Sequence, residues 1–130
     1  MLFRKRKLLS DIKLLGRWGE GRCEKFLKKK GLVTLARNFS CKTGEIDLVM
    51  ANKADGAVVF VEVKTRADES FAQIEDAVTS AKKAKLIRAA KYFLTVNNIS
   101  DRPYRFDVVT IILGPKLREQ IRHYKNAFVP

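Results

Sequence analysis

Two segments of the chain are apolar on both faces, and they limit the fold more than any other feature. Residues 57–64 read AVVFVEVK and residues 104–113 read YRFDVVTIIL, so most positions in each segment are β-branched, aromatic or otherwise apolar. Strands of this kind lie inside a sheet that is covered on both sides. The sequence therefore predicts an α/β fold, with a central mixed β-sheet flanked by helices.

Hydrophobic periodicity predicts the remaining elements. Helical spacing covers residues 12–30 and about 73–96, where Ser80 marks either a cap or a kink. The expected strands are residues 32–39, 44–50, 57–64, 104–113 and 121–128. The order is α-β-β-β-α-β-β, in a single domain that spans residues 1–130.

The charge of the chain favours a polyanionic partner. Lys and Arg number 27 against 14 Asp and Glu, which gives a net charge of +13 and a pI near 10. A domain with this field concentrates phosphate groups near its surface, although charge by itself names no activity. The basic N-terminal extension, residues 1–11, and the first helix hold much of the excess. We interpret this region either as a solvated helix face with a basic arm or as a phosphate-contacting edge.

The cysteine and histidine content excludes several classes of site. Cys23 and Cys41 are the only cysteines and form no Cys-x-x-Cys pair, so a zinc ribbon or finger lacks its ligands. Free thiols in a reducing cytoplasm are expected. His123 is the only histidine, which argues against a histidine-centred hydrolase, and we expect it to be a half-exposed strand residue. No apolar run approaches the ~18 residues of a membrane span.

Carboxylates stand at the ends of two predicted strands that form a hairpin. Alternation along residues 44–50 puts Asp47 and Glu45 on the side opposite Ile46. If the turn is centred near residues 53–54, Asp47 faces Phe60 across the pair, and Glu62 faces Glu45. Because side chains repeat with period two, we expect Glu62 and Lys64 to project from the same face as Asp47.

Such a cluster is costly at the end of buried strands. Each buried ion loses hydration worth several kcal/mol, and like charges add repulsion. A divalent cation removes this repulsion, and Mg²⁺ prefers hard oxygen ligands. One interpretation is therefore that Glu62 holds a metal ion and Lys64 acts on what the ion holds. The alternative is a Glu62–Lys64 ion pair that only satisfies itself, with Glu45 as a rim residue.

The residues also resemble a known motif. Asp47, followed by a hairpin and Glu62-Val63-Lys64, is similar to the signature of the PD-(D/E)XK nuclease superfamily. The segments GRWGE, GLVTLARNFS, GEIDLVM, VVFVEVKTR, EDAV and YRFDVV together resemble the bacterial YraN-like family of predicted endonucleases, which is distantly related to archaeal Holliday junction resolvases. The resemblance covers roughly residues 12–113 and implies a restriction-endonuclease-like fold.

The resemblance also implies roles for particular residues. Asp47 and Glu62 match the metal-binding carboxylates, and the Val63 carbonyl matches the usual third oxygen. Lys64 matches the residue that orients or activates the attacking water. Glu20, from GRWGE, matches an additional acidic residue of the metal site, although an ion pair with a base one turn away is an equal alternative. The implied cofactor is Mg²⁺, with Mn²⁺ as a substitute.

The expected activity is metal-dependent hydrolysis of phosphodiesters in DNA, selective for branched or single-strand-containing structures rather than for sequence. The basic residues expected to grip the nucleic acid are Arg17, Arg22, Lys42, Arg66, Lys82, Lys83 and Lys85. Trp18, Phe71 and Tyr104 could stack on a base, but a core or rim role is preferred for each. Asp107 is interpreted as a buried, hydrogen-bonded carboxylate that supports the sheet.

Two other function classes stay open. The same charge and scaffold would suit a nucleic-acid-binding module without catalysis. A third class is an adaptor whose basic arm contacts a protein. A homodimer would suit junction cutting, although no residue pattern marks a dimer face. We expect a cytoplasmic protein with no membrane partner.

Overall fold

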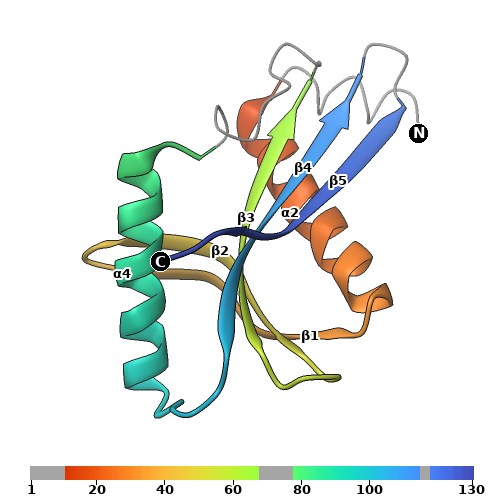
Figure 1. The fold of residues 1–130 in the computed structure, drawn as a ribbon. Helices are drawn as coiled ribbons and strands as arrows, with labels where there is room; N and C mark the ends of the chain where they lie inside the picture. The colour runs from red at the N-terminus through yellow and green to blue at the C-terminus, as the bar shows by residue number, and fades with distance from the viewer. Residues whose placement is uncertain (1–10, 68–77, 115–117) are drawn as a thin grey trace.

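The computed structural model describes residues 11–67, 78–114 and 118–130. Within these ranges the elements follow the predicted order α-β-β-β-α-β-β (Figure 1). They are α2 (Ile12–Lys29), β1 (Leu32–Cys41), β2 (Gly44–Asn52), β3 (Val58–Arg66), α4 (Ser80–Val96), β4 (Tyr104–Leu113) and β5 (Glu119–Phe128). The predicted α/β fold is confirmed, and the arrangement is consistent with a restriction-endonuclease-like fold.

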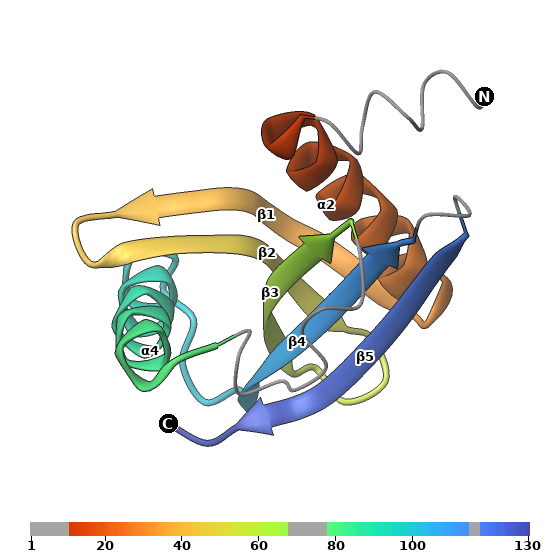
Figure 2. The same cartoon turned by 90° about the horizontal axis from the view of Figure 1, so that it is seen from above.

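The five strands form one mixed sheet in the order β1-β2-β3-β4-β5. The β3–β4 pair is parallel, and the other neighbouring pairs are antiparallel. Seen from above, α2 and α4 lie on opposite sides of this sheet (Figure 2). No helix in the described ranges combines the length and apolar character needed to cross a membrane.

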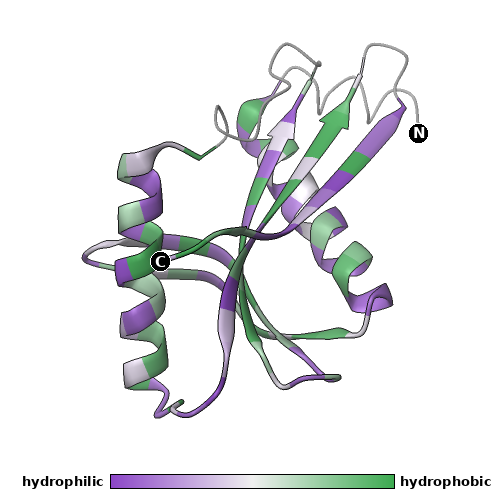
Figure 3. Ribbon diagram, in the orientation of Figure 1, coloured by the Kyte–Doolittle hydropathy of each residue, from purple (hydrophilic) through white to green (hydrophobic). Residues whose placement is uncertain are grey.

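Each side of the sheet has its own core. Phe60, Phe93 and Phe106 belong to the cluster beneath α4, whereas Leu27 and Val61 belong to the cluster beneath α2. Neighbouring residues of β3 therefore enter different cores, which explains why the central strands are apolar on both faces. Colouring by hydropathy shows the same contrast, since β4 is largely hydrophobic and the edge strand β5 is largely hydrophilic (Figure 3).

The helices start at side-chain caps. The Asp11 carboxylate accepts the Leu14 N–H at the start of α2, and Gly31 follows the helix with a left-handed φ of 94°. Thr79 caps α4 by accepting the Lys82 N–H. The helix therefore begins at Ser80, where a cap or kink is predicted. Residues 73–77 of the longer predicted helix lie outside the described residues.

The hairpin between β2 and β3 has a different register from the predicted one. Val49 pairs with Phe60 and Leu48 with Val61, so Asp47 does not face Phe60 and Glu45 does not face Glu62. The reason is a longer loop, in which Gly56 takes a φ of 73° and donates its N–H to the Asn52 carbonyl. The pairing moves by two residues along β3, which brings Glu62 rather than Phe60 toward Asp47.

The predicted alternation along β2 fails near Asp47. Ile46 and Val49 lie in the core beneath α4, whereas Leu48 lies in the core beneath α2. On the neighbouring strand Asn38 takes a left-handed φ of 49°, and the β1–β2 pairing has no partner for Asp47. This local twist turns Ile46 to the other face and places Asp47 at an irregular point of the sheet.

Gly19 allows α2 to approach β3 closely. A Cβ at this position would overlap the side chain of Thr65, which directly follows Lys64 in β3. Gly21, in the same helix, has open space where its Cβ would be. Substitution of these two glycines by alanine therefore separates the steric effect at Gly19 from the gain in helix propensity, which is the same at both positions.

We predict that Gly19→Ala lowers the free energy of unfolding by about 1–3 kcal/mol, because the added methyl group pushes α2 away from β3. Gly21→Ala, the matched control, should raise it by up to about 1 kcal/mol, because alanine favours the helix. Urea denaturation measures both. Equal effects of the two substitutions would contradict the close approach.

Candidate functional site

The site lies where β2 separates from β3. Their paired residues end at Leu48 and Val61, and Asp47 is the next residue of β2. The Asp47 Oδ2 atom accepts the Val63 N–H at 2.8 Å. A carboxylate thus accepts a hydrogen bond from β3 just beyond the end of the regular pairing. This contact fixes the Asp47 side chain against the main chain of β3.

Glu62 meets Asp47 at this fork. The side chain of Glu62 is 7% exposed, and the two carboxyl groups are close enough to share a hydrogen bond. Burial raises the pKa of Asp47 to about 8, with the hydrogen bond and charge of Glu62 acting in the same direction. The pair is therefore under electrostatic strain when both groups are ionised.

Two lysines approach Glu62. The Lys82 Nζ atom, from the first turn of α4, lies 3.0 Å from Glu62 Oε2. Among the described residues, no group donates a well-aligned hydrogen bond to this buried oxygen, so the Lys82 contact is an ion pair without ideal geometry. Burial and, to a smaller extent, the neighbouring Lys82 together lower the pKa of Lys64 to about 8. For Lys82, the contact with Lys64 and the charge of Glu62 outweigh burial and raise its pKa.

Glu20 approaches the pair from α2. It lines a pocket of about 230 Å³ together with Arg17, Asn38 and Asp47. Burial and the charge of Glu62 raise the pKa of Glu20, while a hydrogen bond with Asn38 opposes this shift. Glu20 therefore faces the acidic fork. Its neighbour Glu24 instead forms ion pairs with Arg37 and Lys28, as its helical spacing predicts for Lys28.

The carboxylates converge by a route that differs from the predicted single face. Asp47 lines the pocket beneath α2, whereas Glu62 pairs with Lys82 of α4, so the two side chains meet at the fork from different sides. Glu45 is exposed. Within the described residues, no three His, Cys, Asp or Glu side chains are close enough to hold a metal ion on their own.

The donor set nevertheless fits a hard cation. Asp47 and Glu62 provide carboxylate oxygens, and one Glu62 oxygen is buried without an aligned donor from the described residues. Mg²⁺ commonly binds through one or two protein carboxylates and keeps several water ligands. The main chain of Val63 contacts Asp47 through its N–H. Metal binding by the Val63 carbonyl stays a prediction.

The predicted basic residues fall into separate places. Lys82 lies at the fork, Arg17 lines the neighbouring pocket, and Lys42 lies at the tip of the β1–β2 hairpin close to α4. The others have different neighbours: Arg22 pairs with Glu119, Lys83 lies over the Phe128 ring, Arg66 donates to the Thr65 carbonyl, and Lys85 packs beside Gly44.

The aromatic candidates have structural positions where they are described. Trp18 packs beside the core beneath α2, and Tyr104 packs beside the core beneath α4. Phe71 lies outside the described residues. The sequence reasoning missed Tyr92, which is 51% exposed on α4. Helical spacing beside buried Phe93 gave no signal for it, because exposure depends on where the β1–β2 hairpin packs.

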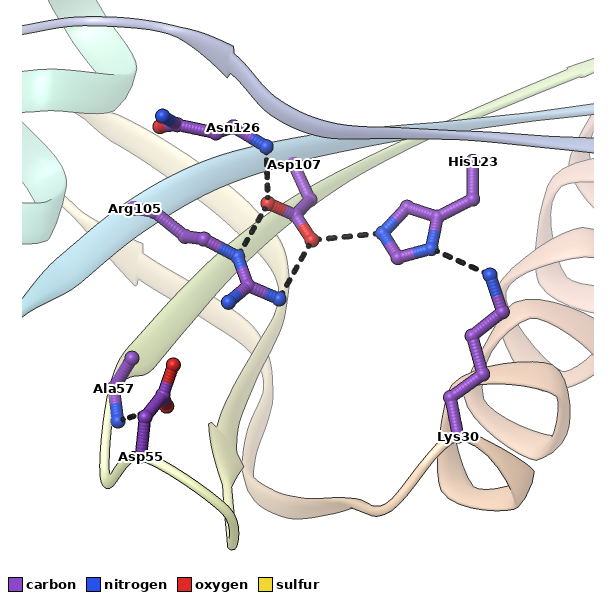
Figure 4. A network of polar contacts seen from close by, with 7 residues as sticks. All are labelled: Lys30, Asp55, Ala57, Arg105, Asp107, His123 and Asn126. Atoms are coloured by element: carbon purple, nitrogen blue, oxygen red, sulfur yellow. Dashed lines mark hydrogen bonds and ion pairs between the residues drawn. The ribbon is translucent and has the colours of Figure 1, made fainter.

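Asp107 has the predicted structural role. Its fully buried carboxylate accepts hydrogen bonds from Arg105 Nε at 3.0 Å and from the Asn126 N–H at 2.9 Å (Figure 4). Asn126 has a left-handed φ of 52° at an irregular point of the β4–β5 pairing. These donors, with His123, outweigh burial and lower the pKa of Asp107. The carboxylate therefore stabilises the bend in β5.

His123 is more enclosed than the predicted half-exposed residue, since its side chain is 8% exposed. Its Nε2 lies 2.7 Å from Asp107 Oδ2, and its Nδ1 lies 3.0 Å from Lys30 Nζ (Figure 4). An ammonium only donates, so Nδ1 accepts from Lys30 and Nε2–H donates to Asp107. The sequence offered no sign of this link between α2 and β5.

Sequence comparisons place relatives across most of the chain. The profile of the "Uncharacterised protein family UPF0102" matches residues 19–111. A UPF0102 protein from Pelobacter propionicus is 41% identical over 118 residues, which cover 91% of this chain and 84% of the relative. One from Caldicellulosiruptor saccharolyticus is 42% identical over 115 residues, covering 88% of this chain and 96% of the relative. The matched region includes the residues described at the fork, which are Glu20, Asp47, Glu62, Lys64 and Lys82.

We predict that Asp47→Asn raises the free energy of unfolding near pH 8 by at least about 1.4 kcal/mol, the equivalent of one pKa unit. The raised pKa of Asp47 means that its contribution to stability is present at low pH and is lost between pH about 4 and about 8. Asparagine keeps an acceptor for Val63 without the charge. Urea unfolding across this range measures the difference, which should shrink toward pH about 4. Asp55→Asn is the control, since Asp55 accepts the Ala57 N–H in an exposed turn.

Asp107→Asn should have the opposite effect. The lowered pKa of Asp107 means that its contribution is present above the ordinary carboxyl pKa and is lost as the pH falls through the folded value. We expect a loss of about 2–3 kcal/mol near pH 7, typical of a hydrogen bond to a charged group. The difference from wild type should narrow below pH about 4. A neutral effect at pH 7 would contradict the structural role.

Proposed function

The chain belongs to the uncharacterised protein family UPF0102, and for this member we propose a function as a metal-dependent endonuclease of the PD-(D/E)XK type that hydrolyses phosphodiesters in DNA. One observation carries the proposal: Asp47 and Glu62 converge beside Lys64 at the fork between β2 and β3. If these residues served only stability, apolar side chains of similar volume at the same positions would make the protein more stable. The strain is explained if the cluster has a chemical task.

Asp47 and Glu62 would hold Mg²⁺ or Mn²⁺, with Glu20 as an additional acidic residue from the α2 side. When bound, the ion supplies Lewis-acid stabilisation of negative charge on the phosphate and activates water for attack. The two carboxylates repel each other when both are ionised, and a bound cation would remove this repulsion. The repulsion therefore supports cation binding at this position.

The remaining steps fall to the side chains of the fork. Lys64 follows Glu62 by two residues on β3, so its ammonium would donate hydrogen bonds to the attacking water or to a phosphoryl oxygen. Lys82 forms an ion pair with Glu62. With a cation held by the two carboxylates, the Lys82 ammonium would be available to bind a substrate phosphate.

The distribution of positive charge supports structure-selective rather than sequence-specific binding. The net charge is +13, and lysines along α4 continue from Lys82 to Lys85. Lysine contacts with phosphates position a nucleic acid but carry little sequence information. We therefore propose branched or single-strand-containing DNA as the substrate.

A non-catalytic nucleic-acid-binding module is the second candidate. The Lys82–Glu62 ion pair favours it, because a permanent internal cation would leave no need for a metal ion. The described residues also lack a third acidic ligand close enough to complete a protein-only site. Cleavage in the presence of a divalent cation separates the two candidates.

We predict that the wild-type protein cuts flapped or four-way-junction DNA faster than linear duplex when Mg²⁺ or Mn²⁺ is present. Asp47→Asn and Lys64→Ala should each lower the cleavage rate by at least about 100-fold and largely spare binding. Gel-resolved cleavage measures the rate, and fluorescence anisotropy measures the affinity.

Lys53→Ala is the matched control, since Lys53 is exposed in the loop between β2 and β3. Its cleavage rate should stay close to that of wild type. If the wild-type protein cuts none of these DNAs but binds them with a steep salt dependence, the binding module is correct and the endonuclease is not.

A further inference from the structure

A second hollow lies between α4 and the tip of the β1–β2 hairpin. Figures 1 and 2 both show the end of this hairpin lying alongside the helix. The pocket has a volume of about 490 Å³. Its lining residues are Ser40, Cys41, Lys42, Thr43, Arg88 and Tyr92. None of them belongs to the fork described above.

The pocket is basic. Lys42 reaches it from the hairpin and Arg88 from α4, and the described lining residues include no acidic side chain. Both basic residues are exposed, so they are accessible to an anion from solvent. Two cationic groups on facing elements match a phosphate better than they match a neutral ligand.

The pocket also presents an aromatic ring. Tyr92 is 51% exposed, and its ring lies 6.2 Å from that of Phe39 at a tilted angle of 34°. Phe39 in turn contacts the buried Phe93 edge-to-face, so the aromatic group is anchored to the core. An anchored and half-exposed aromatic ring beside an arginine is the arrangement with which proteins stack unpaired bases.

One helix connects the pocket with the fork. Lys82 pairs with Glu62, Lys85 packs beside Gly44 at the hairpin, and Tyr92 lines the pocket. Ten residues of α-helix rise about 15 Å, so Tyr92 lies about that far along α4 from Lys82. A strand whose phosphate occupies the fork therefore needs a few nucleotides to reach the pocket.

We propose that this pocket binds one unpaired nucleotide of a DNA strand, with its base stacked on Tyr92 and its phosphate held by Arg88 and Lys42. The inference rests on the proposed function for the class of substrate, but the pocket binds without catalysis. It supplies a reason for structure selectivity, because a base reaches Tyr92 only where it is not paired. A regular duplex would contact Lys42 and Arg88 through its phosphates without filling the pocket.

The chain contains its own reporter for this pocket. Cys41 is a lining residue, and hydrogen bonding with Thr43 lowers the pKa of its thiol. Cys23, the only other cysteine, is fully buried, and burial raises its pKa to about 12. Alkylation of the folded protein therefore reports on Cys41 alone.

The test measures the rate of Cys41 alkylation in the presence of EDTA, with the modified residue identified by mass spectrometry. An oligodeoxythymidine of about 16 nucleotides is the probe, and a duplex of the same length is the comparison. We expect saturating single strand to slow alkylation at least about tenfold, and the duplex to slow it much less.

Substitutions assign the contacts. Tyr92→Ala should weaken binding of the single strand about tenfold, whereas Tyr92→Phe, which keeps the ring, should stay within about twofold of wild type. Arg88→Gln should weaken binding and reduce the salt dependence. Lys53→Gln is the charge control, since Lys53 lies at the opposite end of β2 from the hairpin tip.

The proposal is overturned if the single strand fails to bind, binds without protecting Cys41, or protects no better than the duplex. It is also overturned if Tyr92→Ala leaves the affinity unchanged. Because these measurements exclude divalent metal, protection without any cleavage in the metal-containing assay would retain the pocket and reject the endonuclease. Cleavage without protection would do the reverse.

Discussion

The hydrogen bond from the Val63 N–H to Asp47 Oδ2 is the contact on which the proposed site depends. It lies where the β2–β3 pairing ends, so a side-chain carboxylate receives the N–H of a central strand. Without it, β2 would leave β3 with an unsatisfied donor at the fork. The contact also sets the position of Asp47 relative to Glu62, because Glu62 directly precedes the donor residue. A single interaction therefore satisfies the sheet and assembles the acidic pair.

Buried carboxylates serve opposite purposes in this molecule. Asp107 is surrounded by donors, and its pKa falls, so its ionised form stabilises the fold. Asp47 lies against Glu62, and the pKa of Asp47 rises, so ionisation of Asp47 opposes folding. Burial alone would not distinguish these residues. The number of hydrogen-bond donors around each carboxylate distinguishes them: Asp107 has several, whereas Asp47 and Glu62 have few, which is the arrangement expected of a pair that binds a ligand.

Local patterns predicted the elements, whereas the geometry of the fork required information that no local pattern contains. The apolar faces of β3 and β4 follow from their residues, and the start of α4 follows from the cap beside Ser80. The predicted register of the β2–β3 hairpin was wrong because the loop length depends on the left-handed φ of Gly56, in a loop that asparagine and aspartate side chains stabilise. The predicted alternation of faces along β2 was wrong because of the twist at Asn38. The shift of two residues places Glu62 beside Asp47 at the end of the pairing, so the two carboxylates converge although the predicted register and the predicted single face are both wrong.

Helix α4 gives the two proposed sites a fixed separation. Its first turn supplies Lys82 to Glu62, and its later turns supply Arg88 and Tyr92 to the pocket. Because buried Leu86, Ala89 and Phe93 hold the helix against the sheet, neither end can move without disturbing the core. A nucleotide held at Tyr92 therefore restricts which phosphate of the same strand can reach the fork. The length of α4 would then set the distance from an unpaired base to the phosphodiester that is hydrolysed. Selectivity for DNA structure would therefore need no contact that distinguishes one base from another.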